Sequence, residues 1–93
     1  MFYVIYCIDK PEHNEVRLKY RPEHRSWLES QVSRVVGSGP LLTDDGSEVF
    51  GSMLIIECSS REDAEQFASS DPYSKAGLFQ SVIINRWHRV MPA

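Results

Sequence analysis

"FYVIYCID", residues 2–9, decides the fold, because it is apolar at nearly every position and rich in β-branched and aromatic side chains. A strand with one face in solvent alternates apolar and polar residues, and this stretch does not alternate. It therefore predicts a central strand that is buried on both faces. The rest of the chain must supply strand partners along its two edges and cover for its two faces.

A helix is predicted after the polar segment "KPEHNEV", with Pro22 in the first helical position and Gly37 at its end. Its core-facing stripe has apolar residues at positions i, i+4, i+7 and i+8, which are Leu28, Val32, Val35 and Val36. Residues 14–20 can add one or two turns of helix before Pro22.

The following segment, "GPLLTDDGSEVFGSMLIIEC", predicts two strands over about residues 39–44 and 50–58, joined by the turn "DDGS". A second helix follows, opened by a capping box of Ser59 and Glu62. Its inner stripe consists of Ala64, Phe67 and Ala68. "SVIINRWHRV", residues 81–90, predicts the last strand.

The predicted element order is β-α-β-β-α-β, which is typical of the ferredoxin-like α+β fold. Residues 1–93 then form one domain, with a four-stranded antiparallel sheet in the order 4-1-3-2 and both helices on one face. Because the first strand is apolar on both faces, the second face of the sheet also needs cover. A homodimer that packs sheet against sheet would bury it.

Composition narrows the class of protein. The chain has 93 residues, of which 42% are hydrophobic and 25% charged, and a net charge of −3. Basic residues do not cluster, so nucleic acid is not an expected partner. The apolar runs are of strand length, so no membrane span is expected, and the N-terminus lacks the features of a signal peptide, which favours a cytoplasmic location.

Cofactors and metals are not expected either. Cys7 and Cys58 suit a reducing compartment and lack metal-ligand spacing. No phosphate-binding loop and no convincing metal cluster occurs in the sequence.

Two ionisable residues fall where the topology brings helix ends together. His24 continues the apolar stripe of the first helix, and Asp71 continues the inner stripe of the second, at the same end of the domain. A carboxylate there can fix the tautomer of the imidazole and raise its basicity, which predicts a catalytic His24–Asp71 pair. Alternatively, Asp71 caps a short helix, "PYSKAG", and His24 is a core histidine that bonds to backbone.

Other residues at this end are candidates for substrate contact. Ser52 and Tyr73 can line a pocket or serve only in packing. Cys7 can contact substrate or act as a nucleophile near a histidine, although a small core residue is the favoured interpretation. Arginines recur every four residues at Arg17, Arg21 and Arg25; they could hold an anionic or phenolate substrate, but a solvated helix face is favoured.

Four segments resemble, in this order, the YCII-related (YciI-like) family: "FYVIYCID", "RPEHRSWL", "GSMLIIE" and "DPYSKAGLF". The resemblance covers nearly the whole chain, and "RPEH" and "DPYSKAG" are its most specific parts. It implies a ferredoxin-like fold, dimers of the dimeric α/β-barrel type, and a His–Asp site whose roles fall on His24 and Asp71. Ser52 and Tyr73 match positions near that site. The segment between the first helix and the third strand is short here, so any lid over the pocket is small.

The resemblance also implies an activity. Similar members include a dehydrochlorinase that acts on a chlorinated hydroxyhydroquinone, which implies a cofactor-free lyase or isomerase of small aromatic compounds with His24 as base or acid. Two alternatives remain at this point. One is a non-catalytic small-molecule-binding or accessory dimer, and the other is a structural dimer in which the His24–Asp71 contact only locks the helix ends together.

Overall fold

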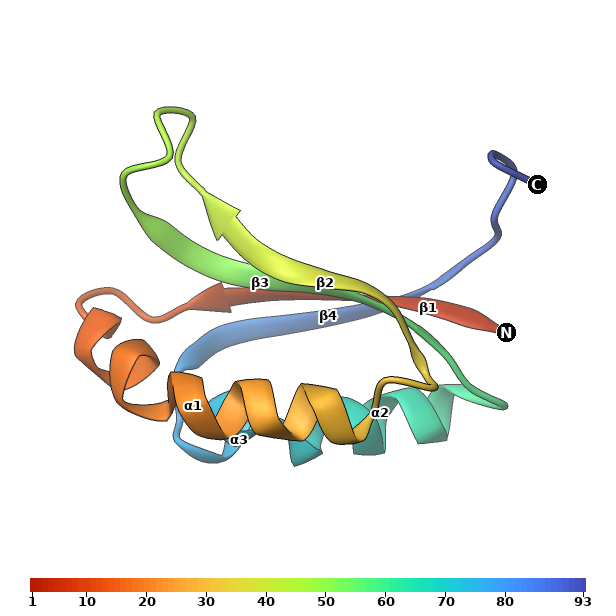
Figure 1. The fold of residues 1–93 in the computed structure, drawn as a ribbon, viewed down its shortest axis with the longest axis horizontal. Coiled ribbons are helices and arrows are strands. Elements are labelled where there is room, and N and C mark those ends of the chain that lie inside the picture. The colour runs from red at the N-terminus through yellow and green to blue at the C-terminus, as the bar shows by residue number, and fades with distance from the viewer.

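The computed structural model describes all 93 residues. The chain forms one four-stranded sheet that is backed by helices. Strands β1, β2, β3 and β4 span Phe2–Asp9, Val35–Leu42, Val49–Glu57 and Phe79–Trp87, and helices α1, α2 and α3 span Asn14–Ser30, Arg61–Ser70 and Pro72–Lys75. The strand order is β2-β3-β1-β4, and every neighbouring pair is antiparallel. This is the predicted order 4-1-3-2 read from the other edge, so the ferredoxin-like α+β fold is confirmed. Both long helices lie under one face of the sheet (Figure 1).

The core lies between the helices and the inner face of the sheet. Tyr3, Ile5 and Cys7 alternate inward along β1 and are almost fully buried. They meet Leu54 and Ile56 of β3 and the inner residues of α2, including the predicted Ala64, Phe67 and Ala68. Burial alternates along β1 because only one face of the sheet packs on helices within the chain, so the predicted burial of the other face is not supplied by the chain itself.

The predicted bounds of the first helix were wrong at both ends. Helix α1 begins at Asn14, so Pro22 lies inside it rather than at its first position, while the added turns over residues 14–20 are confirmed. At the other end Val35 and Val36 belong to β2, where Val35 pairs with Ile56, and Val32 is exposed. A short run of valines fits either periodicity, and here pairing with β3 overrides the helical pattern.

The predicted cap of the second helix is displaced by one residue. Ser60, not Ser59, is the N-cap of α2, and its hydroxyl accepts the backbone N–H of Asp63 at 3.2 Å. The Ser59 hydroxyl instead donates to the carboxylate of Asp63. A serine therefore caps the helix as predicted, but it is Ser60, because the chain reaches the helical conformation one residue later.

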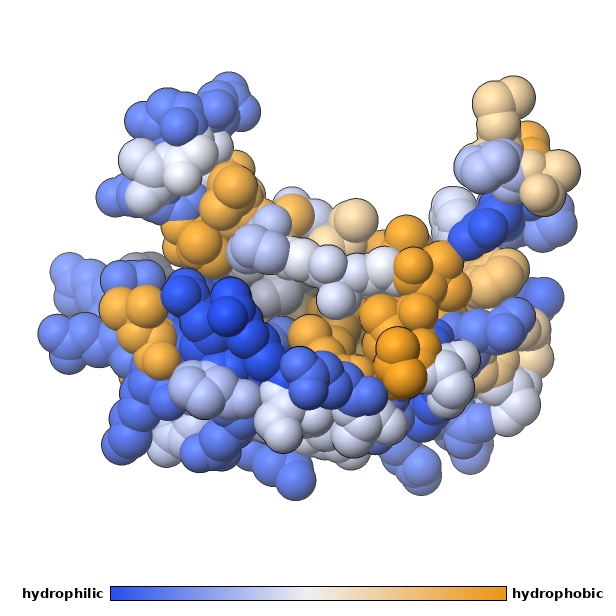
Figure 2. All heavy atoms as spheres, in the orientation of Figure 1, coloured by the Kyte–Doolittle hydropathy of each residue, from blue (hydrophilic) through white to orange (hydrophobic).

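The outer face of the sheet is apolar and has no helix over it. Tyr6 pairs with Met53 on one side and Ile83 on the other, and these three side chains are 36%, 39% and 52% exposed. They form a row across three strands, which we call the outer row. The β2–β3 hairpin and the C-terminal segment both rise on this side (Figure 1), and Figure 2 shows apolar atoms gathered between them.

None of the helices combines the length and the apolar character that crossing a bilayer requires.

Candidate active site

Asp71 links two helices and reaches a third. It ends α2, where its backbone N–H donates to the carbonyl of Ala68, and it begins α3, where its Oδ1 accepts the backbone N–H of Tyr73 at 2.9 Å. Pro72 follows at the first position of α3, as expected from its fixed φ and missing N–H. This local geometry confirms the capping interpretation of Asp71.

The same oxygen of Asp71 also contacts His24 of α1. His24 Nδ1 lies 2.8 Å from Asp71 Oδ1, and the two side chains are only 11% and 3% exposed. Capping and pairing are therefore not alternatives, because one carboxylate does both. A carboxylate without a proton can only accept hydrogen bonds, so Nδ1 carries the hydrogen and Nε2 is left with its lone pair in the neutral ring.

His24 Nε2 makes no hydrogen bond within the protein. The only buried side-chain nitrogen or oxygen without a partner is Nε of Arg89, so Nε2 of His24 is not sealed in the core. His24 lines a cavity of about 280 Å³, the His24 cavity. The nitrogen that could exchange a proton is thus the one that faces an accessible space.

The imidazole is held from its face as well as from Nδ1. Its ring stacks on the ring of Tyr73, with centroids 4.1 Å apart and an interplanar angle of 15°. Tyr73 is almost fully buried, and the guanidinium carbon of Arg17 lies 4.7 Å from its ring centroid. An imidazole fixed by a stacked ring and a carboxylate has little freedom to change its orientation, which is the preorganisation that proton transfer needs.

Arg17 was wrongly predicted to lie on a solvated helix face. It is only 4% exposed, its Nε donates to Asp9 Oδ2 at 2.8 Å, and its Nη2 donates to Asp9 Oδ1 and the Ser52 hydroxyl, both at 2.9 Å. Burial alone would lower the pKa of Arg17, but its interactions with Asp9, and to a smaller extent with Tyr73, outweigh this and hold the pKa above the ordinary value. Arg17 precedes His24 by seven residues, two helical turns, and this spacing was the available signal that both face inward.

The other predicted residues divide between the cavity and the core. Ser52 and Tyr73 line the His24 cavity, together with Arg17, Arg21, Arg25, Leu28, Ser38, Gly39, Pro40, Val49 and Leu54. Cys7 does not line it. Burial, followed by the charges of Asp71 and Asp9, raises the pKa of the Cys7 thiol to about 12, so this residue remains a protonated core side chain rather than a nucleophile.

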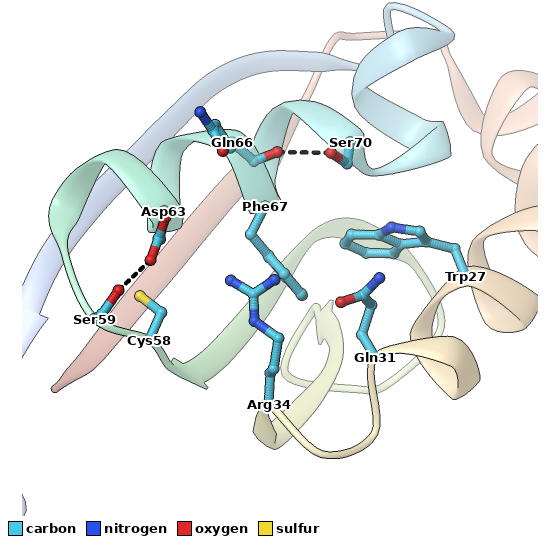
Figure 3. A pocket seen from close by; sticks show the side chains of 9 residues that line it. All are labelled: Trp27, Gln31, Arg34, Cys58, Ser59, Asp63, Gln66, Phe67 and Ser70. Carbon is cyan, nitrogen blue, oxygen red and sulfur yellow. Dashed lines mark hydrogen bonds between the residues drawn. The ribbon is translucent and has the colours of Figure 1, made fainter.

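A second cavity, of about 390 Å³, lies between the end of α1 and α2 (Figure 3). We call it the Trp27 groove. Arg34 lies over the ring of Phe67 at 5.2 Å, and that ring packs against Trp27. Its polar residues largely bond locally, since Ser59 donates to Asp63 and Ser70 donates to the carbonyl of Gln66 (Figure 3). It contains no pair of a base and an orienting acid, so the His24 cavity is the candidate active site.

No group of three or more His, Cys, Asp and Glu side chains gathers anywhere in the structure to hold a metal ion.

Comparison with known proteins gives one consistent result. The YCII-related domain matches residues 1–88. Protein YciI of Escherichia coli O6:H1 is 36% identical, over 97% of this chain and 99% of its own, and an uncharacterised protein of Haemophilus influenzae is 31% identical over the same shares.

A solved structure is similar throughout. It is 5-chloro-2-hydroxyhydroquinone dehydrochlorinase (TftG) from Burkholderia phenoliruptrix in complex with 2,5-dihydroxybenzoquinone, which superimposes with a TM-score of 0.87 and 34% identity over 95% of this chain and 94% of that chain. The family suggested by the four sequence segments is therefore confirmed, and the chain belongs to the YCII-related domain family.

Proposed function

We propose that this protein is a cofactor-free enzyme of the dehydrochlorinase or lyase type, acting on a small aromatic compound such as a chlorinated hydroxyquinol. The observation that carries the proposal is the buried His24–Asp71 contact at 2.8 Å, with Nε2 of the same ring left unpartnered on a cavity. The similarity to a dehydrochlorinase at 34% identity supports the choice of substrate class.

The chemistry matches what one histidine can do. A chlorinated hydroxyhydroquinone has three ring hydroxyls, and loss of HCl converts it to a hydroxybenzoquinone. Two hydroxyl protons leave the ring oxygens, one proton is delivered to the carbon that bears chlorine, and the C–Cl bond breaks with its electron pair on chloride. The ring is oxidised while that carbon is reduced, so no external oxidant is required. His24 would take a proton at Nε2 and return one to the ring, and Asp71 would stabilise the imidazolium in between.

The test is chloride release under anaerobic conditions with no added cofactor. The substrates are 5-chloro-2-hydroxyhydroquinone and a panel of chlorocatechols, which lack the third hydroxyl. We expect release from the triol well above the rate in buffer and little release from the catechols. The third hydroxyl donates electrons that favour protonation of the carbon bearing chlorine, and it stabilises the quinone that forms. Heat-unfolded protein is the control. If folded protein releases no more chloride than buffer does, the dehydrochlorinase proposal is wrong.

We also propose that the outer face of the sheet binds a second copy of this chain. Three apolar side chains of the outer row, 36–52% exposed, support this, because a row of this kind across a sheet is rarely left in water.

Ile83→Lys should therefore yield a monomer at concentrations where the unmodified protein is a dimer, as measured by sedimentation velocity. Leu18→Lys is the matched control, since Leu18 is 50% exposed but belongs to α1 on the other side of the sheet. A monomeric unmodified protein would contradict this proposal.

A further inference from the structure

The His24 cavity is lined by basic residues and by no acidic ones. Three arginines and His24 contribute to its wall, and no Asp or Glu does. Two of these basic residues already have an acidic partner that does not line the cavity: Arg17 pairs with Asp9, and His24 pairs with Asp71. The charges that remain unmatched belong to Arg21 and Arg25.

These two guanidinium groups have no partner inside the protein. The acid–base pairs of the chain are Arg17–Asp9, His24–Asp71 and Arg61–Glu65, so none includes Arg21 or Arg25. Neither residue donates a side-chain hydrogen bond or lies over an aromatic ring, unlike Arg17, Arg34 and Arg89. Arg21 also lines a hollow with three acidic residues, Asp9, Glu12 and Glu48, yet none of their carboxylates pairs with it. Arg21 is half-buried and Arg25 is exposed, so a ligand from solvent can reach both guanidinium groups.

The spacing of Arg21 and Arg25 allows both guanidinium groups to bind the same ligand. Arg21 and Arg25 are four residues apart on α1, so their side chains lie next to each other on the helix surface. Like charges at this spacing repel each other, which destabilises the helix. An anion between them would reverse this penalty. His24 follows Arg21 by three residues, a spacing at which side chains are neighbours on a helix, and all three residues line the same cavity. An anion held by the two arginines would therefore lie beside the imidazole.

We propose that Arg21 and Arg25 form an anion-binding subsite of the His24 cavity, and that the natural ligand is a planar organic molecule with an ionised oxygen. This rests on the proposed function only for the identity of the ring compound. Leu28, Pro40 and Tyr73 provide wall for the ring, while the two guanidiniums hold the oxygen by charge-assisted hydrogen bonds.

The probe is 2,5-dihydroxybenzoquinone, whose hydroxyls are conjugated to carbonyls and therefore ionise as carboxylic acids do. Its dimethyl ether has the same ring without the charge, and 2,5-dihydroxybenzoate carries its charge on a carboxylate instead. Titration calorimetry would compare the three ligands on the unmodified protein, Arg21→Gln, Arg25→Gln and Arg34→Gln. Arg34 is the matched control, because it is half-buried too but lines the Trp27 groove.

We expect the quinone anion to bind about tenfold more weakly to each of Arg21→Gln and Arg25→Gln, and unchanged to Arg34→Gln. Its affinity should fall as salt is raised from about 0.05 to about 0.5 M, since the arginines are near the surface. The dimethyl ether should bind weakly to all four proteins. If 2,5-dihydroxybenzoate binding also depends on the two arginines, the subsite accepts a carboxylate. If only the quinone anion depends on them, the subsite is selective for an ionised ring hydroxyl.

The subsite is overturned if the quinone does not bind, or if it binds equally to all four proteins regardless of salt. Far-ultraviolet circular dichroism and melting temperature establish that each variant is folded. The outcomes separate this inference from the proposed activity. Arginine-dependent binding without chloride release supports the subsite and contradicts the enzyme proposal. Chloride release at the same rate in the unmodified protein and in both arginine variants supports the enzyme proposal and contradicts the subsite.

Discussion

Replacing His24 by glutamine is expected to lower chloride release by about 100- to 10,000-fold, the range attributed to a positioned general acid or base. Glutamine can still donate an amide N–H to Asp71, so the buried carboxylate retains a partner, but an amide takes up no proton near neutral pH. The protein should therefore fold, which near-ultraviolet circular dichroism would check. His13→Gln is the control, since the only hydrogen bond of the His13 side chain is to the carbonyl of Pro11 in the loop before α1.

Two substitutions at Asp71 distinguish its role as the N-cap of α3 from its proposed role in catalysis. Asparagine keeps an oxygen that accepts the N–H of Tyr73 but removes the charge that would stabilise the imidazolium. Asp71→Asn should therefore lose most of the activity, approaching the loss in His24→Gln, with a smaller loss of stability than Asp71→Ala. Alanine also removes the cap, which costs about 1 kcal/mol of further stability. If Asp71→Asn releases chloride at the unmodified rate, the Asp71 charge has no catalytic role.

The paired residues were predictable because their placement depends on periodicity and topology alone. His24 and Asp71 each extend an apolar stripe, and the β-α-β-β-α-β order brings the two helix ends together whatever the details of packing. The error at the end of α1 did not disturb this, since His24 lies well inside the helix. The sequence does not reveal that one oxygen of Asp71 serves both His24 and the Tyr73 amide, because a residue pattern places side chains on a face but does not place their individual atoms.

Arg17 was missed for a physical reason. A basic residue every fourth position is usually solvated, and an arginine is buried only when a partner is buried with it. Its partners are Asp9, at the end of β1, and Ser52, on β3. Those contacts depend on how closely α1 packs on the sheet, and no pattern within the helix encodes that distance. The seven-residue spacing to His24 places Arg17 on the face of α1 that is turned to the sheet, but only the folded structure shows that the Asp9 carboxylate lies there.

The Arg17–Asp9 pair leads to the largest expected loss of stability. Arg17→Met keeps a long side chain of similar reach but leaves the Asp9 carboxylate, whose side chain is 9% exposed, without its cation. Breaking a buried pair from one side costs about 3–5 kcal/mol, a large share of the stability of a small domain. Urea unfolding followed by tryptophan fluorescence would measure it, and Asp9→Asn, which retains an acceptor for Arg17, is the milder variant if Arg17→Met does not fold.

The double variant Arg17→Met with Asp9→Leu shows whether the loss comes from an uncompensated charge. With both ionic groups replaced by apolar ones, no carboxylate is left in the buried site, so stability should recover by at least half of the loss in Arg17→Met alone. Recovery of stability should not restore binding of the quinone, because Ser52 and Tyr73 would still have lost the guanidinium that contacts both. If the double variant is as unstable as the sum of the single ones, Arg17 stabilises the domain mainly through its packing on Tyr73, and its pairing with Asp9 is secondary.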